Sequence, residues 1–123
     1  MIKISLDEII TLVPILKELM NNSFDSSLSF KIGRLIRELD KELELFNESH
    51  MQIVKKYGVR DSQGEFIFEN NQVKVTDIEK CNAELQELLN TNIEIYAEKI
   101  SISAFDGIKI TPSQAIVLDL IVE

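Results

Sequence analysis

The feature that most constrains this chain is the stretch 28–57, where apolar side chains recur at heptad spacing. The spacing predicts one helix of about 30 residues, roughly 45 Å long at 1.5 Å per residue. Two rows of side chains share one face of it, and such rows form a seam that packs against another helix. The seam residues are Ile32, Leu39, Phe46 and Ile53 in one row, and Ile36, Leu43, His50 and Tyr57 in the other.

The segment after residue 57 predicts a β-hairpin that reverses the chain. Gly58 suits the left-handed position that ends many helices, and Lys55 and Lys56 oppose the negative end of the helix dipole. Asp61–Gly64 and Asn70-Asn71 are turn sequences, while "EFIF" and "QVKV" are typical of short strands. We therefore expect a two-stranded ribbon between two helices.

A third helix is predicted to return along the seam of the long one. The capping-box spacing of Thr76 and Glu79 marks its start, and "NTN" after Leu89 marks its end. It is only about half as long as the seam, so the first helix of the chain or a second copy must cover the rest. The side chains expected to face inward are Ile78, Cys81, Leu85, Leu88 and Leu89.

The two ends of the chain predict shorter helices. Ser5 and Glu8 form an N-terminal capping box, and Pro14 predicts a kink or a break into two helices. Residues 21–27 provide a polar turn before the long helix. The apolar stripe of the first helix holds Leu6, Ile9, Ile10, Val13, Leu16, Leu19 and Met20.

In the last third, "IEIYAEKISIS" predicts extended chain with a bulge or tight bend near Glu98, and "IKI" predicts another short strand. Thr111, Pro112 and Gln114 then begin a final helix. The predicted fold is mainly α with small β elements (α+β), in a single domain over residues 1–123. A long helix, a hairpin and a third helix form an antiparallel helical hairpin, flanked by a kinked N-terminal helix and a short C-terminal helix.

The net charge of −8 is concentrated in the second half of the chain. Residues 1–60 contain nine Lys/Arg and nine Asp/Glu, whereas residues 61–123 contain four and twelve. The absence of a basic stripe argues against direct nucleic-acid binding. The acidity is explained either by solubility or by imitation of DNA on another protein. No apolar run approaches the roughly 20 residues that span a membrane, and no secretion signal is evident.

Residues that could perform chemistry are few. The single cysteine, Cys81, is predicted to be a buried small hydrophobe in a reducing cytoplasm. His50, the only histidine, is interpreted as a packed or register-setting residue, with a pH-sensitive contact or chemistry as the alternatives. The carboxylate pairs on helices are interpreted as solvated charges. No nucleotide, metal or nucleophile motif occurs, so we predict no enzyme, no cofactor and no catalytic, cofactor-binding or metal residues.

Five segments carry a resemblance to a known family: "SLDEIITLVPILKELM", "KIGRLIRELDKELELFNE", "KKYGVRDSQGEF", "CNAELQELLN" and "FDGIKITPSQ". Through them the chain resembles small uncharacterised proteins encoded by bacteriophages and prophages of Gram-positive bacteria. The resemblance covers nearly the whole length, although each segment alone is only a helix, turn or cap signal. It implies a phage origin and a setting in the host cytoplasm or the virion, and it supplies no catalytic residues.

Two functions from different classes are consistent with these features. The first is a noncatalytic virion structural or assembly accessory that self-associates through the helical seam, as a homo-oligomer and foremost as a dimer. The alternative is a host-directed inhibitor or regulator that binds a bacterial protein, for which the acidic second half is a candidate surface. In both cases the predicted partner is a protein: a second copy of this chain, a host protein or another phage protein. We expect no direct binding to nucleic acid or to a membrane.

Overall fold

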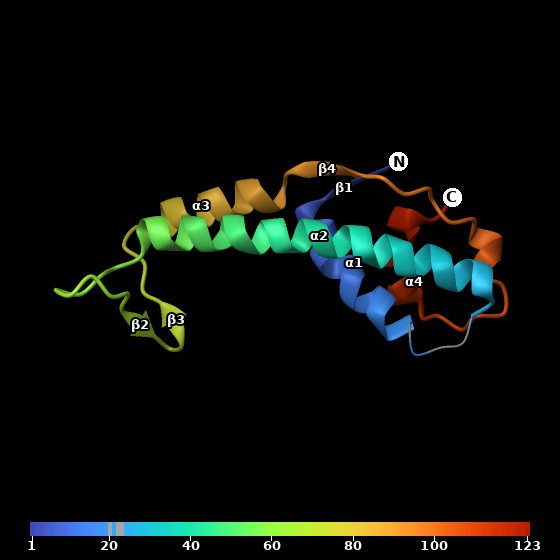
Figure 1. Cartoon of the computed structure of the whole chain (residues 1–123), viewed down its shortest axis with the longest axis horizontal. Helices are drawn as coiled ribbons and strands as arrows, with labels where there is room; N and C mark the ends of the chain where they lie inside the picture. Colours follow the sequence, from blue (N-terminus) through green and yellow to red (C-terminus); the bar gives the residue numbers. More distant parts are fainter. Residues whose placement is uncertain (20, 22–23) are drawn as a thin grey trace.

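A computed structural model describes residues 1–19, 21 and 24–123 of the chain. The predicted class, mainly α with small β elements, is confirmed. Helix α2 runs along the long axis of the molecule, with α3 beside one half of it and α1, α4 and both termini beside the other half (Figure 1). The elements in order are β1 (Ile2–Ser5), α1 (Leu6–Leu19), α2 (Ser26–Tyr57), β2 (Phe68–Glu69), β3 (Gln72–Val73), α3 (Ile78–Leu89), β4 (Asn92–Ile95), the 3-10 helix η1 (Ile102–Phe105), α4 (Pro112–Leu118) and the 3-10 helix η2 (Asp119–Ile121).

Helix α1 begins at the predicted capping box. The Ser5 N–H donates to Glu8 Oε1 at 3.0 Å, and the Glu8 N–H donates to Ser5 Oγ at 3.1 Å. The break expected at Pro14 is wrong, because α1 is one helix with Pro14 on its exposed side. Burial of the apolar stripe around the proline offsets the one hydrogen bond that it removes.

Two positions of the predicted α1 stripe need comment. Ile10 was expected to face inward but is 37% exposed, because it lies at the edge of the face that packs on α2. Met20 lies outside the described residues, as do residues 22–23 of the predicted 21–27 turn. Beyond that turn, Asp25 caps α2 by accepting a hydrogen bond from the Leu28 N–H at 2.9 Å.

Strand β1 was not predicted, and it joins the two ends of the chain. It pairs antiparallel with β4, with Ile2 opposite Ile95 and Ile4 opposite Ile93. Ile2, Ile4 and Ile95 are buried against the helices. We call the described residues up to 39 together with 90–123 the body. Its central side chains, each at most 2% exposed, are Ile9, Leu12, Leu16, Ile32, Leu35, Leu39, Leu118 and Ile121.

The segment after β4 differs from the extended chain predicted for it. A bend at residues 96–97 agrees with the turn expected near Glu98. Residues 102–105 form η1 instead of a strand, and the strand expected at 108–110 is absent from this fully described segment. Earlier in the segment, Ile100 pairs with Val122 in an isolated parallel bridge. The α4 capping box of Thr111 and Gln114 is confirmed, with Pro112 in the first turn.

The predicted hairpin between α2 and α3 is confirmed, but the helix caps on either side of it differ from those predicted. Gly58 is extended (φ −67°, ψ 136°), so the predicted left-handed cap is wrong. Glycine is needed there because a Cβ would lie 2.7 Å from the ring of Phe66. The predicted Thr76 capping box is also wrong: Asp77 caps α3, and the Thr76 side chain donates instead to the Tyr57 carbonyl at 3.2 Å.

The turn of the hairpin forms at Asn70-Asn71, where both residues have positive φ angles of 53° and 64°. Two consecutive left-handed residues match the twist of a tight two-residue hairpin, and asparagine tolerates that conformation well. We call residues 40–89, which hold the rest of α2, the hairpin and α3, the arm. The hairpin projects from the far end of the arm (Figure 1).

Candidate functional site: an open apolar face

The described residues contain no cluster of histidine, cysteine or carboxylate side chains suited to a metal ion, and no polar or charged residue among them is buried. Catalytic groups usually gain their reactivity from burial and from close partners. In the described part of the chain, the polar and charged side chains all lie at least partly exposed on the surface.

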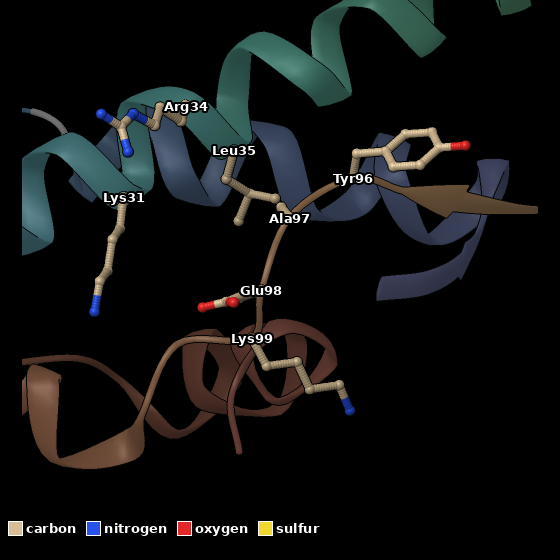
Figure 2. Close-up of a pocket in the computed structure, with 7 residues that line it drawn as sticks. All are labelled: Lys31, Arg34, Leu35, Tyr96, Ala97, Glu98 and Lys99. Atoms are coloured by element: carbon tan, nitrogen blue, oxygen red, sulfur yellow. The ribbon is translucent and has the colours of Figure 1, made fainter. Parts of the chain in front are cut away.

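One cleft, of about 290 Å³, lies between α2 and residues 96–99. Lys31 and the carboxylate of Glu98 point toward the same space, whereas Tyr96 and Lys99 point away from it (Figure 2). Arg34 adds a second positive charge at the α2 wall. The cleft thus has two cationic side chains on its α2 wall and one carboxylate on the opposite wall, and none of these polar residues is buried.

The predicted seam does lie on one face of α2, but its two halves have different partners. Ile32, Ile36 and Leu39 are buried at 2%, 7% and 1% exposure, where α1 packs on α2. The partner of the second half is α3. There the seam residues are only partly buried: Leu43, Phe46, His50, Ile53 and Tyr57.

Polar contacts join α2 and α3 at the far end of the arm. Glu84 accepts hydrogen bonds from Lys56 Nζ at 2.8 Å and from the Tyr57 hydroxyl at 3.0 Å. The hydrogen bond from Lys56, followed by that from Tyr57, lowers the pKa of Glu84. The hydrogen bond to Glu84 also raises the pKa of Lys56. The pKa of Tyr57 is raised mainly by burial of its hydroxyl and secondly by the hydrogen bond to Glu84. These contacts fix the register of the two helices.

The apolar contacts between α2 and α3 leave most of their side chains only partly buried. Within residues 40–89, all of which are described, only Cys81 is fully buried, at 3% exposure. Its predicted burial is confirmed, and this burial raises the pKa of its thiol. Ile78, predicted to face inward, is instead 59% exposed, because it lies to one side of the α2 contact in the first turn of α3.

An apolar groove of about 450 Å³ opens where α1 begins and α3 ends. The Leu6 N–H donates to the Thr91 carbonyl at 3.1 Å, which holds these two ends together. The ring of His50 lies in the groove against that of Phe46, with centroids 5.7 Å apart. The residues lining the groove are Asp7, Ile10, Phe46, Asn47, His50, Leu85 and Leu89.

Further apolar side chains lie beyond the groove along the arm, where Ile78 borders a second hollow beside the hairpin strands. Phe46, His50 and Val54 follow one another at four-residue steps and therefore share one side of α2. Helical spacing likewise places Ile78 on the side of α3 that carries Leu85 and Leu89. We call this surface the open face; it consists of Phe46, His50, Val54, Ile78, Leu85 and Leu89.

The sequence identified residues of the open face only as seam or inward-facing packing positions. Heptad spacing identified Phe46 and His50, and the α3 stripe included Leu85 and Leu89. Asp7, Ile10 and Asn47 were missed because they reach the groove only when α1 crosses α2 beside the end of α3. The exposed position of Ile10 at the edge of its stripe was the one available signal.

No protein-family model, curated protein or solved structure matches the chain. Among the described residues, no helix is both long enough and apolar enough to cross a membrane.

Proposed function

We propose that this protein is noncatalytic and acts through protein–protein contacts, as a self-associating structural or assembly component. The observation that carries the proposal is the open face of the arm. It places Phe46 of α2 and Leu85 of α3 around one groove, and Ile78, farther along α3, is 59% exposed.

Two helices alone cannot enclose a core. Stable domains stack at least two layers of elements around buried side chains. In the body, α1, α4 and the β1–β4 pair provide these layers, whereas α2 and α3 in the arm form one layer. A protein that covers the open face removes apolar surface from water, which contributes about 25 cal/mol per Å².

The resemblance to phage and prophage proteins supports a specific setting for this role. A small noncatalytic protein that self-associates suits a virion structural part or an assembly accessory, and it would act in the host cytoplasm or the virion. The homo-oligomer is then the working form, and no cofactor takes part in it.

The test is sedimentation equilibrium over roughly 1–100 μM, a range suited to micromolar affinities. We expect the mass to rise from 14.1 kDa toward twice that value. Ile78→Lys should hold the protein at the monomer mass, since it puts a charge on the open face. Leu45→Lys is the matched control, because Leu45 is equally exposed, at 57% against 59%, on another side of α2. A wild-type protein that stays at 14.1 kDa throughout would overturn the proposal.

A second candidate function rests on the hairpin. Phe68 is 66% exposed at its tip, with Glu69 beside it. An aromatic side chain next to carboxylates suits a basic, apolar pocket on a host protein, as for an inhibitor or regulator. This alternative predicts a monomer that binds one host protein. Phe68→Ser should abolish that binding, whereas Ile78→Lys should leave it unchanged.

A further inference from the structure

The two halves of α2 differ in what covers them, and this difference identifies the surface that needs a partner. All fully buried residues of α2 lie between Leu28 and Leu39, although the whole helix is described. The heptad rows that seat α1 on the first half continue into the second half, beside the groove. There α3 covers one side of these rows, and the groove leaves another side of Phe46 and His50 open to a further helix.

From this surface, and resting on the self-association proposed above, we infer that the partner is the arm of a second copy. Helix α2 of each copy packs antiparallel against α2 of the other, and two α2–α3 hairpins stack into a four-helix bundle. The two-fold axis passes near His50. Two-fold dimers are the commonest oligomers, and a four-helix bundle gives each hairpin the second layer that it lacks.

The open face complements itself under such an axis. Phe46 and Val54 lie one turn to either side of His50 on α2. In an antiparallel pair, Phe46 of one copy faces Val54 of the other, and the two His50 rings meet near the axis. A large side chain thus opposes a small one at both ends of the contact, which is how facing layers interdigitate.

Charge selects the antiparallel arrangement over the parallel one. Glu44 and Lys55 are exposed on the flank of α2 beside the open face, about three helical turns apart on the same side. Neither forms an ion pair with any described residue. Antiparallel packing brings Glu44 of one copy opposite Lys55 of the other, twice per dimer. Parallel packing would instead oppose like charges, which is unfavourable.

Met51 lies between Glu44 and Lys55 on this flank and is 45% exposed. It extends the apolar contact outward from His50 toward the charged rim. An apolar centre with a charged rim is the usual anatomy of a specific protein interface. The core of the body, by contrast, is already enclosed by α1, α4, η2 and the β1–β4 pair.

Disulfide trapping tests the geometry directly. His50→Cys places a thiol beside the two-fold axis, whereas Gln52→Cys places it on the exposed, opposite side of α2. A disulfide requires Cα atoms within roughly 7 Å of each other. Mild oxidation at low micromolar concentration should cross-link His50→Cys at least ten times faster than Gln52→Cys. The buried Cys81 is removed with Cys81→Ala in a parallel series.

Charge exchange provides the second arm of the test. Glu44→Lys or Lys55→Glu alone should weaken the dimer roughly 3- to 10-fold, because each opposes like charges at two sites. Combining the two substitutions should return the dissociation constant to within about 2-fold of wild type. A dimer of normal mass that fails both tests would overturn this geometry and leave the proposed self-association standing. A protein that stays monomeric at every concentration would overturn both.

Discussion

The body and the arm are built on the same helix, yet they reach different degrees of burial. Over the body, α2 packs against α1, with further layers around it, and its seam residues are at most 7% exposed. Over the arm, α3 is the main partner of α2, α1 reaches α2 only at the groove, and the same two rows are half-buried. The comparison shows that a continuous heptad pattern fixes the direction in which a helix faces its partner, but not how many layers enclose the contact.

The largest expected effect is a charge placed in the body. Leu39→Asp should lower the free energy of unfolding by about 3 to 5 kcal/mol, because Leu39 is 1% exposed and an aspartate there has no partner. Glu48→Lys, on the exposed side of α2, should change it by less than about 0.5 kcal/mol. Urea melts of both variants measure this, and similar midpoints would refute the assignment of the seam.

A matched pair of leucines compares the two regions quantitatively. Leu35→Ala in the body should cost about 2 to 5 kcal/mol, since Leu35 is 2% exposed in a closed core. Leu85→Ala in the arm should cost about 1 kcal/mol in the monomer, because its side chain is half-exposed at the groove. Denaturant unfolding at low protein concentration measures both costs. Equal losses would mean that the arm has a closed core of its own.

Substitution by alanine should change the free energy of unfolding in opposite directions at two glycines, one inside α2 and one just after its end. Gly33 is exposed in the body half of α2 with no atom within 4 Å of an added Cβ, so Gly33→Ala should stabilise by about 0.5 to 1 kcal/mol. Gly58→Ala should destabilise by about 1 kcal/mol, because the Cβ would displace the Phe66 ring from the end of α2. Thermal melts compare the two, and a stabilising Gly58→Ala would contradict the described hairpin packing.

The elements that the sequence predicted correctly depend on local chemistry. The capping boxes at Ser5 and Thr111 and the Asn70-Asn71 turn each need only neighbouring residues. The missed or wrong features depend on distant parts of the chain. Strand β1 forms because β4 reaches it from the other end of the sequence, and Gly58 stays extended because Phe66 folds back over it.

The candidate site likewise combines local features with contacts between distant parts of the chain. Periodicity could place Phe46 and His50 on one face of a helix, but it could not tell that α1 would cover only the body half of that face. The groove lies where the start of α1 meets the end of α3, with the Leu6 N–H bonded to the Thr91 carbonyl and Leu89 in the groove wall. That boundary is a product of tertiary packing, which no local pattern encodes.

The smallest expected effect is the pH dependence of the α2–α3 contact. Because the folded pKa of Glu84 is below its ordinary value of 4.5, the stabilisation from its carboxylate is fully present above that pH. It is lost as the pH falls through the lower, folded pKa. Lys56 acts in the opposite direction: its raised pKa means that its contribution is lost as the pH rises above its ordinary value of 10.5.

Acid titration of the wild type and of Glu84→Gln tests this sign. The variant should be less stable near neutral pH, and the difference between the two proteins should shrink as the pH falls below about 4.5. Glu87→Gln, on a neighbouring exposed position of α3, is the matched control and should leave the stability near neutral pH within about 0.5 kcal/mol of wild type. A constant difference between wild type and Glu84→Gln at every pH would contradict the assigned contact.

The most direct measurement of the central claim is amide hydrogen exchange along α2 as a function of protein concentration. The account predicts that amides of residues 28–39 exchange slowly and at the same rate throughout a dilution from roughly 100 to 1 μM, since the body encloses them without a partner. Amides of residues 43–57 should lose protection as the dimer dissociates, because binding stabilises only the surface that it covers. If both halves of α2 keep the same protection at every concentration, the arm is complete on its own and the account is wrong.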